Sequence, residues 1–147
     1  MVGPLSLFSY WISQNGYMTF TTICAAVLVV VTFGVAVFQL SLACGAPWGT
    51  YAFGGGHPGQ LPLRYRVTSA LSLIIYGFQG AVFASMADLV PTWLPEALVT
   101  WILWVFVAFF ALGTIMNSIS RSKRERYMWT RIVGLSLACA LVVALSR

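Results

Sequence analysis

Apolar residues gather in four long runs along this chain, at about 19–43, 67–86, 97–116 and 130–146. The first three runs contain no charged residue, and the fourth contains only Arg131 near its start. A helix in a soluble protein carries polar or charged side chains on the face that meets water. Four stretches of this length with a single charge among them fit the hydrocarbon thickness of a bilayer instead. The pattern therefore predicts an all-α membrane protein, a four transmembrane helix bundle.

The segment before the first run has a different pattern. Met1–Met18 is uncharged but rich in aromatic and leucine residues, and Leu5, Phe8 and Trp11 fall on one helical face. Tryptophan and tyrosine favour the headgroup level of a membrane. We expect an N-terminal interfacial helix that is separated from the first span by a break at Asn15-Gly16.

The only sizeable connection, Cys44–Arg66, contains six glycines and three prolines. This composition is incompatible with a continuous helix. Trp48, Tyr51 and Tyr65 are nevertheless not typical of a solvated linker. We therefore predict a structured Gly/Pro-rich cytoplasmic loop that folds back on the helix ends, where its aromatic side chains can be buried.

Composition supports a single transmembrane domain over residues 1–147. Hydrophobic residues make up 60% of the chain and charged residues 7%, whereas roughly a quarter of the residues in a soluble domain are charged. The net charge of +5 would favour nucleic acid as a partner of a soluble protein. In a membrane protein it reflects topology and contact with anionic lipid headgroups. No nucleic-acid partner is expected.

Basic residues determine the predicted orientation. The connection Ala87–Glu96 has no Lys or Arg and holds two of the three acids. The basic residues lie in or beside the other two connections, with Arg147 as the exception; they are Arg64, Arg66, Arg121, Lys123, Arg124, Arg126 and Arg131. By the positive-inside rule these two connections are cytoplasmic. We predict a multi-pass protein of the bacterial inner (cytoplasmic) membrane with both termini periplasmic.

Several chemistries are disfavoured by what the chain lacks. Haem held by two histidines, or a zinc site made of protein ligands, needs more than the single His57. We expect no metal and no cofactor. No acid lies within the four runs, which disfavours proton-coupled transport of the usual kind. His57 is also the only base available to activate a nucleophile, so we favour a non-enzymatic role.

One polar constellation remains, all of it on the predicted cytoplasmic side. Its members are Trp48, Tyr51, His57, Arg64, Arg66, Asn117, Ser120, Arg124, Glu125 and Arg126. Two interpretations stay open. In the first interpretation, these residues reflect topology alone, and Glu125 pairs with Arg64 or Arg66. Alternatively, their guanidinium groups and the glycine-rich backbone form a ligand-binding site for an anionic or lipid headgroup.

Two of these motifs resemble a known pattern. The sequence Gly45-Ala46-Pro47-Trp48-Gly49, and Asn117 followed by Ser120, Ser122 and Glu125-Arg126, are similar to motifs of small bacterial membrane proteins with four spans whose function is uncharacterised. The resemblance covers most of the chain. It implies an inner-membrane location and that the cytoplasmic motifs matter, but it implies no activity.

Three classes of function follow from these observations. The first is a protein that binds a lipid-like or hydrophobic ligand, or serves as an accessory subunit of a membrane complex. The second is a small oligomeric transporter or channel. The polar residues of the spans look too scattered to line its path; they are Thr21, Thr32, Ser72 and Gln79. The third is an enzyme acting on lipid headgroups. Membrane lipids are the expected partners, and a homo-oligomer is an open alternative.

Overall fold

The chain folds into four long helices and one short helical loop. The computed structural model describes the backbone from Pro4 to Arg147 and the side chains from Phe20 onward. The elements are α1 (Pro4–Cys44), η1 (Gly49–Tyr51), η2 (Phe53–Gly55), α2 (Leu63–Met86), α3 (Glu96–Ser118) and α4 (Lys123–Leu145). Each of the four α-helices is long and apolar enough to cross a membrane. The predicted all-α membrane fold with four spans is confirmed.

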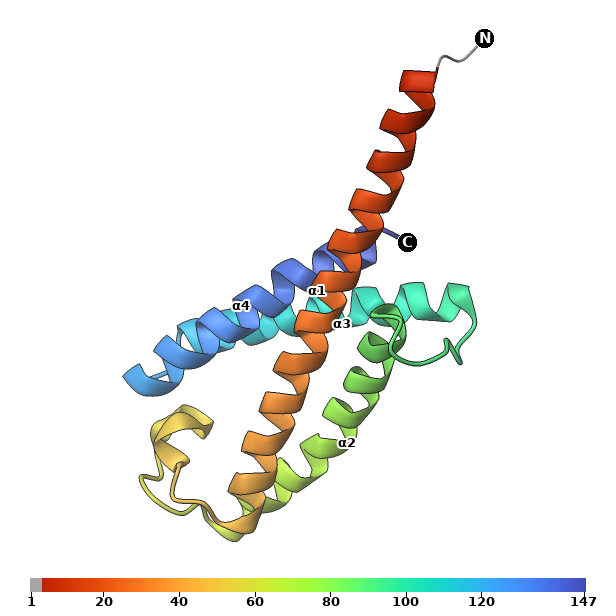
Figure 1. The fold of residues 1–147 in the computed structure, drawn as a ribbon. Coiled ribbons are helices and arrows are strands. Elements are labelled where there is room, and N and C mark those ends of the chain that lie inside the picture. Colours follow the sequence, from red (N-terminus) through yellow and green to blue (C-terminus); the bar gives the residue numbers. More distant parts are fainter. Residues whose placement is uncertain (1–3) are drawn as a thin grey trace.

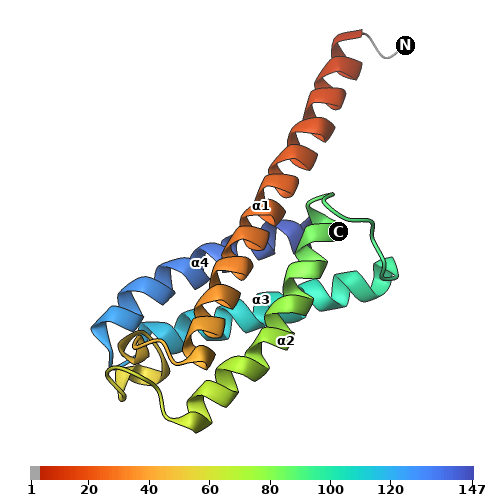
Figure 2. The same cartoon turned by 60° about the horizontal axis from the view of Figure 1, so that its bottom comes forward.

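The helices form two antiparallel hairpins, α1 with α2 and α3 with α4, which cross one another (Figures 1 and 2). Helix α1 also packs against α4 and joins the two hairpins. The main apolar core lies at this contact, where Leu28, Val82, Phe83 and Leu103 are completely buried. The outward faces carry large exposed apolar side chains, among them Trp101, as expected for surfaces that meet lipid.

The expected break at Asn15-Gly16 is absent. Helix α1 runs without interruption from Pro4 to Cys44, and its N-terminal part extends beyond the other helices (Figure 1). From Pro4 onward the first segment is helical as predicted, but it continues the first span instead of forming a separate element. A single glycine costs a helix only about 1 kcal/mol, which a long helix tolerates. The faces predicted for Leu5, Phe8 and Trp11 lie outside the described side chains.

Helix α1 is followed by Gly45, whose backbone conformation strongly favours glycine. Gly45 has a φ of +97°, and the N–H groups of Gly45 and Ala46 return to carbonyls of the last turn at 3.0 and 2.9 Å. This is the Schellman arrangement that commonly closes a helix. The guanidinium Nε of Arg66 donates to the carbonyl of Ala43 at 3.0 Å. The first loop therefore begins with its direction fixed by both backbone and side chain.

The glycine-rich loop is packed on the helix ends, as predicted. Its own backbone is closed by the Gly49 N–H, which donates to the Gly59 carbonyl at 2.9 Å. Leu61 and Ala52 are buried against Leu42 of α1 in a small separate core. Trp48 stacks on the ring of Phe38. It contributes less to the packing of the loop than its size suggests, because 43% of its surface stays exposed.

Two hydrogen bonds fasten this loop to α4. The Ser122 hydroxyl donates to the Thr50 carbonyl at 2.7 Å, and the indole N–H of Trp129 donates to the Tyr51 carbonyl at 2.8 Å. Gly55 lies so close to Ser122 that an added Cβ would be 2.6 Å from the serine Cβ. Residues about 70 positions apart thus meet at one end of the molecule, which places the first and third connections on the same side.

We expect Leu61→Ala to destabilise the protein by about 2–3 kcal/mol, because it removes the side chain at the centre of the loop core. The measurement is chemical or thermal unfolding in detergent. Leu63→Ala is the matched control: Leu63 is 72% exposed, and its truncation should cost less than about 0.5 kcal/mol. Equal losses in the two variants would mean that the loop does not pack on the helices.

Candidate functional site

A cavity of about 200 Å³ lies between the two hairpins, on the side of the glycine-rich loop. All four helices contribute to its wall, and Tyr51 and Phe53 of the loop close one end. Much of the wall is apolar, with Val35, Phe38 and Phe110 among its members. The cavity is large enough for several water molecules or for part of an apolar ligand.

The polar side chains of the spans converge on this cavity. Those that line it include Thr32, Gln39, Gln79, Asn117, Glu125 and Ser136. Thr32, Gln79 and Ser136 lie about 18 to 24 Å along their helices from the loop end. Thr32 and Ser136 therefore lie near the middle of their membrane-spanning helices, and Gln79 lies past the middle of α2. The crossing of the hairpins brings Thr32 and Gln79 to one wall, so the interpretation that they are scattered is wrong for these two, whereas Thr21 and Ser72 do not line the cavity.

Gln79 is the most informative of these residues. Its side chain is 1% exposed, yet neither its amide oxygen nor its amide nitrogen has a hydrogen-bond partner in the described part of the chain. The amide oxygen of Gln39, which faces the same cavity, is also buried without a partner. A buried amide without partners costs about 1–3 kcal/mol. The cavity thus presents donors and acceptors that a bound molecule would satisfy.

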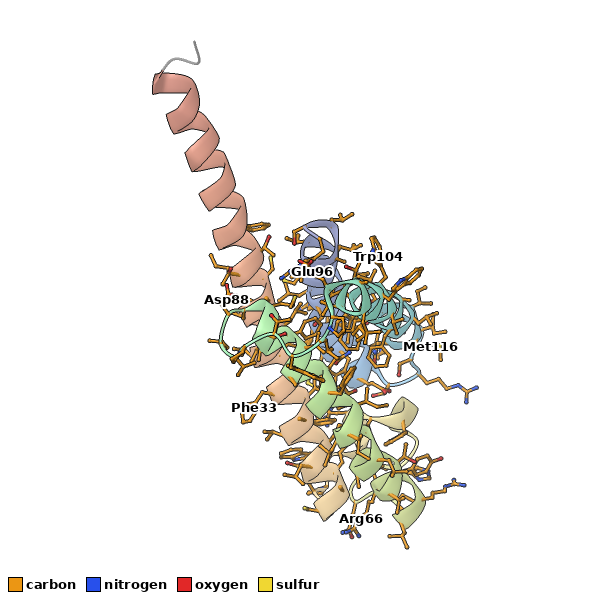
Figure 3. The ribbon with its side chains drawn as sticks, turned by 90° about the vertical axis from the view of Figure 1, so that its right-hand side faces the viewer. Phe33, Arg66, Asp88, Glu96, Trp104 and Met116 are labelled. Atoms are coloured by element: carbon orange, nitrogen blue, oxygen red, sulfur yellow. The ribbon has the colours of Figure 1, made fainter. Side chains whose placement is uncertain are left out.

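The opposite half of the structure is filled by the apolar core. Leu28, Val82 and Leu103 are completely buried there, nearer to the acidic connection than the residues of the cavity. Figure 3 shows Asp88 and Glu96 toward that end of the molecule and Arg66 at the other end. Among the described residues, the polar wall therefore extends from the loop side into the membrane but does not continue to the far side.

Glu125 lies at the cavity end of a compact hydrogen-bond network. Its carboxylate accepts a 2.5 Å hydrogen bond from the Ser120 hydroxyl, and its own N–H donates to Ser122 Oγ at 3.3 Å. The Ser122 N–H donates in turn to Ser120 Oγ at 3.3 Å. Ser122 is thus the N-cap of α4, and the acid in the first turn also interacts favourably with the helix dipole.

The predicted pairing of Glu125 with Arg64 or Arg66 is wrong. The ion pair found among residues 20–147 joins Arg147 to Glu96 at the opposite end, 4.0 Å apart. The Arg66 side chain binds the end of α1, and that of Arg64 lies over the ring of Tyr65, 4.6 Å from its centroid. Both are drawn to partners nearer in sequence, which leaves the Glu125 carboxylate to the Ser120 hydroxyl.

The ten predicted site residues therefore separate into groups. Tyr51, Asn117 and Glu125 line the cavity, and Ser120 supports it through Glu125. Asn117 also donates from Nδ2 to the Gly113 carbonyl at 2.7 Å, which holds its amide against α3.

The remaining members lie around the cavity instead of in its wall. His57 of the loop and Arg64 of α2 contact Tyr65 in the first turn of α2. Arg124 lies 5.9 Å from the ring of Tyr51. Trp48 covers Phe38 from outside. Arg66 holds the end of α1. Arg126 faces a separate groove at the α3–α4 end.

Gln79 and Ser136 are not among the predicted site residues, although the sequence carries a signal for them. Strongly polar side chains deep in a span almost always face the interior of a bundle. The series Ser122-x-x-Glu125 is also the capping-box pattern, which would have indicated a local serine partner near Glu125. Among the described residues, no three His, Cys, Asp or Glu side chains are placed to hold a metal ion.

Comparisons of the chain with protein-family models, with curated proteins and with solved structures give no match.

We expect a double-mutant cycle to show coupling between Ser120 and Glu125. Ser120→Ala and Glu125→Gln should each destabilise the protein, and the double variant should lose about 1 kcal/mol less than the sum, because both changes weaken the same charge-assisted hydrogen bond. The free energy of unfolding in detergent is the measurement. Glu125→Gln combined with Arg64→Gln or Arg66→Gln should be additive within about 0.5 kcal/mol. Coupling to either arginine instead would restore the ion-pair interpretation.

Proposed function

We propose that this chain is a small polytopic protein of the bacterial inner membrane that binds a lipid-like ligand in the cavity between its hairpins. The proposal depends on one observation above all: Gln79 is fully buried at the cavity wall with both amide atoms unpaired. Inside a membrane a polar side chain without partners is costly and is a strong indicator of a functional site. A ligand that both donates and accepts hydrogen bonds would remove this cost.

The composition of the wall indicates the class of ligand. Aromatic and branched side chains, such as Phe38, Phe110 and Val35, favour an apolar or planar body. The unpaired amide of Gln79 and the unpaired amide oxygen of Gln39 favour a neutral polar group beside that body, since together they offer a donor and acceptors. Glu125 adds one carboxylate at the end of the cavity nearest the loop. An amphipathic molecule with a small uncharged polar head fits this arrangement better than an inorganic ion.

A transporter is the second candidate, favoured by the depth of the polar wall. Thr32, Gln79 and Ser136 carry hydrogen-bonding groups as far as the middle of their membrane-spanning helices. The buried core on the far side would then have to open during transport, in the manner of alternating access. An accessory subunit and an enzyme acting on lipid headgroups have no observation of their own in their favour. The resemblance to small four-span bacterial proteins remains part of the proposal.

The proposed orientation places the glycine-rich loop in the cytoplasm and both termini in the periplasm. Its support is the distribution of bases, which gather around the two connections joined by the Ser122–Thr50 hydrogen bond. The cavity would then be nearer to the cytoplasmic leaflet.

We expect Gln79→Leu to abolish ligand binding without destabilising the empty protein. Leucine has a similar volume and no unpaired polar atoms, so the unfolding free energy of the ligand-free protein should stay the same or rise by about 1 kcal/mol. Native mass spectrometry of the protein extracted with its lipids should show a bound molecule on the wild type, with at least about tenfold lower occupancy on the variant.

The matched control for this experiment is Gln60→Leu. Gln60 is exposed in the loop and does not line the cavity, so its replacement should leave the occupancy unchanged. A bound molecule retained equally by the Gln79 variant would contradict the proposal. A Gln79 variant that loses stability and ligand together would indicate that the amide has a structural partner.

The orientation is tested by labelling single cysteines in intact cells with a reagent that does not cross the membrane. Cysteines at 92 and 147 should react, and a cysteine at 123 should be protected until the cells are opened, because positions 92 and 147 lie at the proposed periplasmic end. Cys24, Cys44 and Cys139 must first be replaced by serine or alanine. Labelling at 123 but not at 92 would reverse the topology.

A further inference from the structure

A second concave surface lies outside the cavity, in the groove between the end of α3 and the beginning of α4. It has a volume of about 300 Å³ and is lined by Ser118, Arg126, Tyr127, Thr130 and Arg131. Arg126 is half-buried, and the guanidinium of Arg131 lies 5.1 Å from the centroid of the Tyr127 ring. Two cations and three hydroxyl groups thus surround one groove on the loop side of the membrane.

The charges of this groove have no counter-ion in the described part of the chain. Glu125, the nearest acid in sequence, is engaged by the Ser120 hydroxyl, and the ion pair of the described residues is at the other end of the molecule. The closest hydrogen bond of Arg126 is a long one, 3.5 Å from Nη1 to the Ser120 carbonyl. Guanidinium groups in this position are free to bind an anion, and phosphate matches their fork geometry well.

Thr130 provides an independent observation. Its hydroxyl oxygen is buried and has no hydrogen-bond partner, although the residue belongs to the wall of the groove. A buried hydroxyl left unpaired is costly, and a phosphate oxygen placed between the two arginines would accept its hydrogen bond.

The depth of the groove indicates that the phosphate belongs to a lipid. Ser118 is the last residue of α3 and Arg126 is in the first turns of α4, so both lie at the end of the spans. Arg131 is one turn deeper than Tyr127, and its long side chain can extend back toward the headgroups. One further turn into the membrane, Ile115 and Leu135 are 58% and 52% exposed and provide an apolar surface for an acyl chain.

We propose that this groove binds the phosphate of an anionic phospholipid headgroup, held by Arg126 and Arg131 with the hydroxyl of Thr130, while an acyl chain lies along Ile115 and Leu135. This site is separate from the cavity, and it does not depend on the identity of any ligand there. It gives the protein a fixed lipid contact at the connection between α3 and α4, next to the serine network that fastens the loop.

The test is a titration of the full-length protein in uncharged detergent with phosphatidylglycerol, followed by native mass spectrometry. Arg126→Gln and Arg131→Gln should each weaken binding about tenfold, because each removes a charge-assisted contact. Arg121→Gln is the matched control: Arg121 is exposed in the same connection but does not line the groove, and its loss should weaken binding at most about twofold.

Thr130→Val distinguishes a built site from diffuse attraction, because it changes no charge. It should weaken binding about threefold while the lipid-free protein melts at the same or a higher temperature. Equal weakening by Arg121→Gln and by the two groove variants would overturn the proposal. Displacement of the lipid by millimolar inorganic phosphate alone would also overturn the assignment to a lipid, since it would show that the groove needs no acyl chain.

Discussion

The crossing of the two hairpins determines most of what is distinctive in this structure. Helices that cross pack closely only near the contact point, and their separation grows away from it. Here the close contact lies on the side of the acidic connection, where Leu28, Val82 and Leu103 are completely buried. On the other side the hairpins diverge, and the space is occupied by the glycine-rich loop and the cavity. The loop therefore fills space between the diverging hairpins in addition to connecting α1 to α2.

The membrane imposes the second constraint. A polar side chain in a span must face the interior, because the hydrocarbon outside offers no hydrogen bonds. Divergent hairpins provide such an interior, and Thr32, Gln79 and Ser136 come from three different helices to meet there. The Ser136 hydroxyl donates to the Ile132 carbonyl of its own helix at 2.9 Å. The Gln79 amide has no such hydrogen bond among the described residues. The contrast separates a polar residue that the helix can accommodate alone from one that requires a partner.

Sequence was sufficient for the spans but not for their arrangement. The absence of charged residues from a stretch of chain predicts the position of each span, because the energetic cost of placing a charge in lipid acts on each segment separately. It cannot indicate which face of a span points inward, because lipid-facing and core-facing positions are both apolar. Gly77 illustrates this: an added Cβ would meet no other atom within 4 Å, whereas at Gly80 it would approach Thr32. The Glu125 partner is a different case: an acid among bases suggests a long-range ion pair, whereas its carboxylate is bound by the hydroxyl of Ser120, five residues away.

One hydroxyl group connects the loop, α4 and the cavity. Ser122 Oγ donates to the Thr50 carbonyl of the loop and accepts the N–H of Glu125, the residue whose carboxylate reaches the cavity. The loop cannot move away from α4 without breaking this bond and the one from Trp129 to Tyr51. Trp129 and Tyr51 themselves line the cavity, so a molecule that fills it touches the groups that hold the loop closed. Tyr51 and Trp129 therefore belong both to the cavity wall and to the contact that holds the loop on α4, and the closed loop is part of what gives the cavity its shape.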